Sequence, residues 1–266
     1  MSFQNTKNNL EYNHPIRPPS EVMKLDRLGS FHQTRLSFTR RLIDDLTYQK
    51  SKIEIHRWDI DNRGIGSAII KITLKNEILS LIVFCHSISD EERTDRVIAE
   101  KWDMTFSLFK GIPDKKELDQ LSKNLKIQES GRHNSKQLTL SRANKSQRIF
   151  KKVLSNLSIG EQPSAKLIND VGYLVRTTAV YGNGKFGIED FSNTKGNDFL
   201  EKPFQAEMLT VYLIRYFSIE LINFLAKKNG GSKSTTLSKS FSKHLGVGNA
   251  TGLGMAPFLV NHQELI

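Results

Sequence analysis

The sequence has few groups able to form cross-links or hold a metal ion, and little that resembles a targeting segment. Its single cysteine, Cys85, cannot form an internal disulfide and is expected to be a buried core thiol. The seven histidines show no H-x-x-x-H spacing and there is no C-x-x-C pair, so no metal site is predicted. The polar first 15 residues lack the apolar core of a signal peptide, so a cytoplasmic location is expected.

Long apolar runs free of charge are also missing. The most apolar run, from Met208 to Leu225, contains Arg215 and Glu220, and each would cost roughly 2.5–3.5 kcal/mol at the centre of a bilayer. We therefore expect a buried core helix and no membrane partner.

The rest of the composition is that of a folded protein. The chain has 266 residues, of which 38% are hydrophobic and 25% charged, which is typical of globular domains. Residues 1–24 combine prolines with few apolar side chains and are expected to form an irregular arm. The helical spacing of apolar residues from Ser30 to about Gln49 predicts an N-terminal helix.

The period changes to alternation after Lys52, and turn residues divide the chain into strands. Trp58 and Ile60 lie on the opposite phase from Ile53 and Ile55, which predicts a bulge near His56 and Arg57. The apolar run from Leu79 to Cys85 predicts a central strand covered on both faces. With a fourth strand around 102–108, residues 25–112 are predicted to form a helix on a four-stranded antiparallel sheet.

Residues 113–266 are predicted to be mainly α-helical, which makes the fold class α+β. The expected helices span residues 114–126, 142–157, 164–178, 204–228 and 237–245. A new apolar stretch begins at 257–260, shortly before the given sequence stops at Ile266, so the chain is expected to be the first part of a longer protein.

Two glycine-rich stretches, 182–187 and 246–254, are the first candidate site. Glycine leaves backbone N–H groups unshielded, and such loops can cradle a phosphate or carboxylate. The candidate ligand-binding residues are Arg176, Thr177, Thr178, Tyr181, Asn183, Gly184, Lys185, Gly248, Asn249 and Thr251. A second interpretation is that both stretches are turns that end or begin helices.

Glu207 is the candidate general base, because a carboxylate in an apolar helix requires a partner. A structural ion-pair set with Arg215 is the alternative. The cofactor and the reaction are not predicted.

The charge is concentrated in one segment. Residues 111–160 carry 11 basic and 4 acidic side chains, and no acidic residue lies between Glu129 and Glu161. This stretch, 132–152, is typical of nucleic-acid contact, of an acidic partner or of a solvated helix face. The nucleic-acid candidates are Arg142, Lys145, Arg148, Lys151 and Lys152.

Three segments, Leu28 to Arg35, Arg176 to Gly187 and Gly248 to Pro257, are similar to those of an uncharacterised family of bacterial proteins. The resemblance implies a protein longer than this chain and transfers no activity.

Three functions are therefore open. The first is a cytoplasmic, enzyme-like protein that binds an anionic metabolite or nucleotide at the two glycine-rich loops. The second is a nucleic-acid-binding protein that uses the basic stretch 132–152. The third is a structural or assembly subunit without a ligand. The sequence does not predict an oligomeric state.

Overall fold

The computed structural model describes residues 50–75, 77–87, 89, 102–124, 136–146, 148–169, 174–181 and 205–245. The elements in chain order are β1 (Lys52–Ile60), β2 (Gly66–Thr73), β3 (Ile78–Ser87), β4 (Trp102–Lys110), α3 (Lys115–Asn124), β5 (Leu140–Lys145), α4 (Ile149–Ser158), α5 (Ala165–Asn169), β6 (Val175–Tyr181), α6 (Gln205–Gly230), the 3₁₀ turn η3 (Gly231–Lys233) and α7 (Lys239–His244). The protein is thus a mixed α+β structure.

The described strands form one antiparallel sheet of six strands in the order β1-β2-β3-β4-β5-β6. Each strand pairs with the next in the chain, as in a meander. The register of β1 shifts between Ile55 and Arg57, so the bulge predicted there is confirmed. The Asp61 carboxylate fixes the β1–β2 turn by accepting the backbone N–H groups of Arg63 and Ile65, each at 2.9 Å.

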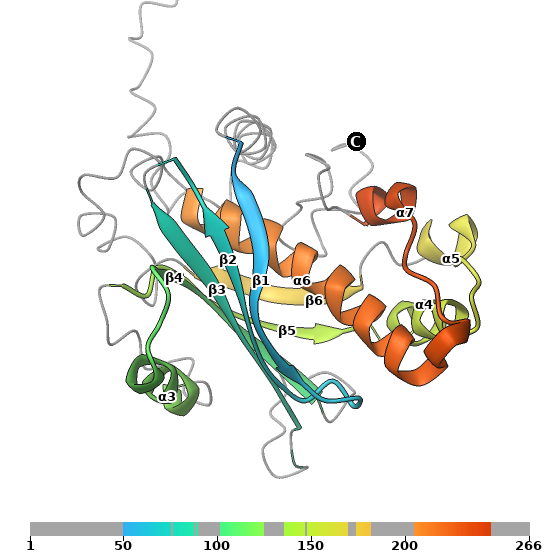
Figure 1. Ribbon diagram of the computed structural model, residues 1–266, viewed down its shortest axis with the longest axis horizontal. Helices are drawn as coiled ribbons and strands as arrows, with labels where there is room; N and C mark the ends of the chain where they lie inside the picture. Colours follow the sequence, from blue (N-terminus) through green and yellow to red (C-terminus); the bar gives the residue numbers. More distant parts are fainter. Residues whose placement is uncertain are drawn as a thin grey trace, which may run out of the picture.

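Helix α6 covers one face of the sheet (Figure 1). The ring of Phe217 packs between Trp58 of β1 and Phe106 of β4, with centroid distances of 5.5 and 5.8 Å. A buried hydroxyl pair, Thr139 and Thr210 at 2.8 Å, ties α6 to the chain that enters β5. This layer contains most of the buried apolar side chains.

The other face is covered in part by α3, where Ile82, Phe109 and Leu121 form a second, smaller apolar cluster. A capping box begins α3, because Asp114 accepts the N–H of Glu117 at 2.7 Å and Glu117 accepts that of Asp114 at 2.9 Å. Strand β3 is central and apolar on both faces, as predicted, because helices lie on both sides of it.

The prediction of four strands was wrong, because the sheet has six. The described residues after 113 are mainly helical, as predicted, but they also form β5 and β6. Residues 142–145 and 175–178, predicted as the start of helix 142–157 and the end of helix 164–178, belong to these two strands, and the rest of the two predictions corresponds to α4 and α5. The apolar residues of 149–157 have helical spacing and form α4. The residues just before them pair with β4, for example Ala143 with Met104, and are therefore a strand. The helices predicted at 114–126, 204–228 and 237–245 are confirmed as α3, α6 and α7. The N-terminal arm and helix lie outside the described residues.

Within the described residues, the stretch Leu209–Lys233 is long and apolar enough to cross a membrane by length and composition. Of its most apolar window, however, 67% is buried inside the protein. It therefore fits the core helix that covers the sheet.

Candidate functional site

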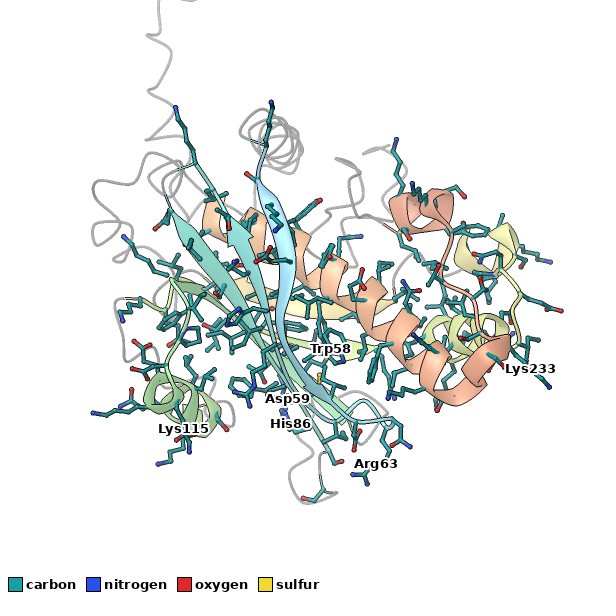
Figure 2. The ribbon with its side chains drawn as sticks, viewed as in Figure 1. Trp58, Asp59, Arg63, His86, Lys115 and Lys233 are labelled. Atoms are coloured by element: carbon teal, nitrogen blue, oxygen red, sulfur yellow. The ribbon has the colours of Figure 1, made fainter. Side chains whose placement is uncertain are left out.

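The helices α4, α5 and α7 gather around the C-terminal end of α6 (Figure 1). We call this region, residues 148–169 and 227–245, the basic end. The region made of β1–β4, α3 and their connections, described residues 50–124, is called the sheet half. Figure 2 shows Lys233 at the basic end and Lys115 on α3, on opposite sides of the molecule.

Helix α4 provides one side of the basic end. Its first turn is held by Ser146, whose Oγ accepts the N–H of Ile149 at 3.2 Å. Phe150, Val153 and Leu157 are buried, whereas Lys151 and Lys152 are exposed. The helix is therefore amphipathic, with its apolar side inward and its lysines in solvent.

Two glycines allow α4 to end against the end of α6. A Cβ atom at Gly230 would lie 2.0 Å from the carbonyl oxygen of Ser158, and one at Gly160 would lie 2.8 Å from that of Lys233. The close approach also allows the N–H of Thr235 to reach the carbonyl of Leu157 at 2.9 Å. Only residues without a side chain fit this crossing.

Side-chain amides then fix the loop between η3 and α7. Gln162 donates to the carbonyl of Thr236 at 2.7 Å and accepts the N–H of Ser238 at 2.8 Å. Asn223 of α6 accepts the N–H of Leu237 at 2.9 Å. The backbone that carries the outer lysines is thus held in place by hydrogen bonds from two helices and a loop.

The basic end carries almost only positive charge. It has nine Lys and Arg residues and one acidic residue, Glu161, whereas the described residues of the sheet half have ten basic and eight acidic. All nine basic residues are exposed. They are Arg148, Lys151, Lys152, Lys166, Lys227, Lys228, Lys233, Lys239 and Lys243.

Ion pairs neutralise much of the charge of the sheet half. Glu54 lies between Lys52, at 2.6 Å, and Lys71. Hydrogen bonds from these two lysines lower the pKa of Glu54 to about 2. Lys136 pairs with Glu117 at 2.7 Å, which raises the pKa of Lys136. Within the basic end itself, one carboxylate accompanies nine cations.

The structure divides the five predicted nucleic-acid residues. Arg148, Lys151 and Lys152 lie at the start and on the outer side of α4. Arg142 lies on β5 between Ser141 and Ala143, which are both buried, so by strand alternation it belongs to the sheet face opposite α6. Lys145 ends β5 and lies 5.7 Å above the ring of Phe150. The basic stretch is therefore not one helix surface.

The residues predicted at the glycine-rich loops are only partly covered. Arg176, Thr177, Thr178 and Tyr181 belong to β6 at the edge of the sheet. The first three were expected at the end of helix 164–178. Asn183, Gly184, Lys185, Gly248, Asn249 and Thr251 lie outside the described residues. The two-loop anion site therefore stays a prediction.

Glu207 lies in the first turn of α6, but its side chain is outside the described part. Arg215 is eight residues further on, roughly 12 Å along the helix axis. Its guanidinium donates to the carbonyl of Leu245 at 2.6 Å, and burial lowers its pKa to about 10. Arg215 thus joins α6 to the end of α7, and the catalytic role of Glu207 stays a prediction.

The expectation for Cys85 is confirmed, because its thiol is buried in the core, 3% exposed. Asp61 lies in the β1–β2 turn, and the backbone N–H of Ile65 lowers the pKa of its carboxyl. Within the described residues, no group of three or more His, Cys, Asp or Glu side chains could hold a metal ion.

Comparisons with protein-family models, with curated proteins and with solved structures find no match to this chain. The resemblance of its glycine-rich segments to an uncharacterised bacterial family stays a prediction. What the protein does is therefore inferred from its own residues.

Sequence reasoning missed six of the nine cations of the basic end, namely Lys166 and the five lysines from Lys227 to Lys243. A signal for the last five exists, because no Asp or Glu occurs between Glu220 and Glu264. This acid-free run is separated from the first one by 60 residues of sequence that contain β6 and most of α6. Only the crossing of α4 and α6 brings the two together.

Proposed function

We infer that this protein binds the phosphate backbone of a nucleic acid with its basic end. The observation that supports the inference is the exposure of all nine cations there, with one acidic residue among them. A polyanion that contacts several of these side chains releases the counterions condensed on its phosphates, and this release favours binding.

The scaffold adds to this effect. The lysines stand on backbone held by the close approach at Gly230 and by the hydrogen bonds of Gln162 and Asn223. A ligand therefore meets cations whose backbone is already ordered, and less conformational entropy is lost on binding. Contacts to phosphate carry no sequence information, so binding through these lysines is expected to depend little on base sequence.

Binding of a fluorescein-labelled oligonucleotide, followed by anisotropy across a series of salt concentrations, tests this function. If about five phosphates are contacted, the logarithm of the association constant should fall with the logarithm of salt concentration with a slope of roughly −3.5 for a single strand. Lys151→Glu with Lys152→Glu should weaken binding about tenfold or more and make the slope shallower.

The matched control is Lys115→Glu with Lys116→Glu, two exposed lysines on α3 that undergo the same change of charge. This control should bind almost as well as the unmodified protein. Equal losses in the two variants would show that net charge alone attracts the ligand, and the basic end would then have no role of its own.

An anionic metabolite held by the two glycine-rich loops is the second candidate. It is favoured by β6, because the first loop follows a strand at the sheet edge, directly after Arg176 and Tyr181. A thermal-shift screen of nucleotides and phosphorylated metabolites tests it. A ligand present at 100 times its dissociation constant raises the free energy of unfolding by about 2.7 kcal/mol. Arg176→Ala or Lys185→Ala should abolish that stabilisation. Both candidates are proposed for a cytoplasmic protein, and an assembly subunit without a ligand is the third interpretation.

A further inference from the structure

A groove of about 510 Å³ opens between β1, the second half of α6 and the loop that follows it. Its volume is within the range of small-molecule sites. The wall from β1 contains Ile55 and Trp58, and α6 contributes Glu220, Asn223, Phe224 and Lys227. The third wall consists of Gly231, Ser232, Ser234, Thr235 and Thr236, four of which carry hydroxyl groups.

Aromatic surface is the first feature of the groove. The rings of Trp58 and Phe224 meet edge to face, with centroids 5.4 Å apart and planes at 60°. Both side chains are half-buried, and Ile55 beside them is 43% exposed. The indole Nε1 of Trp58 is buried and has no hydrogen-bond partner among the described residues. A planar aromatic ligand would cover the exposed parts of these apolar surfaces.

Fixed polar groups are the second feature. Asn223 is oriented by the N–H of Leu237, which its Oδ1 accepts at 2.9 Å. Glu220 is half-buried, and burial raises the pKa of its carboxyl. Amide and carboxyl groups can hydrogen-bond the polar edge of a nucleobase, while aromatic rings stack on its face.

Position is the third feature, because the groove adjoins the basic end. Lys227 belongs to both, and the ammonium of Lys228 lies 5.6 Å from the centre of the Phe224 ring. A chain of phosphates on the lysines around the end of α6 would therefore run past the opening of an aromatic groove. In a duplex the bases are stacked and paired inside, whereas in a single strand they can turn outward.

We propose that the groove between β1 and α6 takes an unstacked base of a single-stranded nucleic acid, with Trp58 and Phe224 as its stacking surface. This proposal rests on the function inferred above and names its substrate class. The aromatic rings of the groove come from β1 and from the second half of α6.

A peptide strand added along β1 is the competing occupant. The described edge strand is poorly suited to it, because the bulge between Ile55 and Arg57 interrupts the regular backbone. Charged pairs, Lys52 with Glu54 and Arg57 with Asp59, also lie along β1, and bulges and charges of this kind oppose strand addition.

The test compares three fluorescein-labelled ligands of equal length: oligothymidylate, the same chain with abasic residues, and a duplex. The oligothymidylate should bind about tenfold or more tightly than the abasic chain, because each stacked base contributes to affinity. In a Trp102→Phe background, so that Trp58 is the only tryptophan, unlabelled oligothymidylate should quench its fluorescence and the abasic chain should not.

Phe224→Leu should remove most of the preference for oligothymidylate and leave the salt slope unchanged, because the lysines are intact. Phe241→Leu, a half-buried phenylalanine of α7 that does not line the groove, is the matched control and should keep the preference. Circular dichroism of both variants shows whether each is folded.

The outcomes separate the two inferences. If the abasic chain binds as tightly as oligothymidylate, the groove takes no base, and the basic end remains a phosphate site. A different result is that thymidine dinucleotide quenches Trp58 while none of the longer oligonucleotides shows a salt-dependent affinity. The groove proposal then holds, and the proposed function fails. Quenching by an unstructured peptide at concentrations where oligothymidylate has no effect would overturn the groove proposal in favour of a peptide.

Discussion

The sheet half and the basic end differ in their balance of positive and negative charge. The described residues of the sheet half include ten basic and eight acidic side chains, and several of these charges neutralise each other in ion pairs such as Lys71 with Glu54. In the basic end, nine basic residues accompany one acidic residue. We propose that this excess of positive charge serves to bind a polyanion.

Both regions depend on one helix, and this gives the largest expected effect. Phe217→Ala removes a fully buried ring that touches Trp58 of β1 and Phe106 of β4. It should lower the free energy of unfolding by about 3–5 kcal/mol, measured by urea denaturation. Phe241→Ala, at a half-buried position on α7, should cost roughly 1–2 kcal/mol. Equal costs would mean that Phe217 is not central to the core.

The next prediction concerns a substitution that destabilises the basic end and leaves the sheet half unchanged. Gly230→Ala would place a Cβ atom 2.0 Å from a backbone oxygen of α4. The crossing must then open, at a cost of about 3 kcal/mol. Hydrogen exchange should become faster in α4 and in residues 231–238, and stay unchanged in β2 and β3.

Gly231→Ala is the control for this change. A Cβ atom there meets nothing within 4 Å, although φ is +57°. The left-handed conformation alone should cost about 1 kcal/mol. If the two alanine variants lose the same stability, the close approach of α4 to α6 does not hold the basic end together.

Much of the sheet half could be predicted from the sequence, because its strands carry the signals that dominate local structure. The alternation of Ala68, Ile70 and Ile72 and the phase change before Trp58 reflect one buried face and one bulge. Both features are local, since each depends on residues adjacent in the chain.

The basic end was harder to predict because its order is not local. Strand β5, which precedes the basic end, is short and carries Arg142 and Lys145, whose spacing also fits a helix. Only its pairing with β4 and β6 makes it a strand. Likewise, nothing near Lys151 in the sequence indicates that Lys233 lies next to the end of α4, or that Trp58 packs against α6. Contacts between residues about 80 positions apart, such as Thr235 with Leu157, create this surface.

The smallest expected effect is a difference between two carboxyl groups. Glu54 of the sheet half is paired, which lowers its pKa to about 2, whereas burial raises that of Glu220 beside the basic end. A carbon-detected NMR titration should therefore show Glu54 charged down to about pH 2 and Glu220 protonated at a higher pH than an ordinary glutamate.

The consequences for stability have opposite signs. Pairing of Glu54 favours the folded state above the ordinary glutamate pKa, and this contribution is lost as the pH falls through about 2. The charged form of Glu220 disfavours the folded state above its raised pKa, and the penalty disappears below the ordinary value. Glu220→Gln should thus stabilise the protein at pH 7, by less than about 1 kcal/mol, and not at pH 4. A stabilisation that is equal at both pH values would contradict burial as the cause.

The most direct test of the central claim is a map of lysine protection. The protein would be acetylated with and without a saturating single-stranded oligonucleotide, and each lysine measured by mass spectrometry. Protection should fall on Lys151, Lys152, Lys227, Lys228 and Lys233, whereas Lys75, Lys115, Lys116 and Lys123 should react equally with and without the ligand. Protection that is spread evenly over both regions, or found only in the sheet half, would contradict a nucleic-acid site at the basic end.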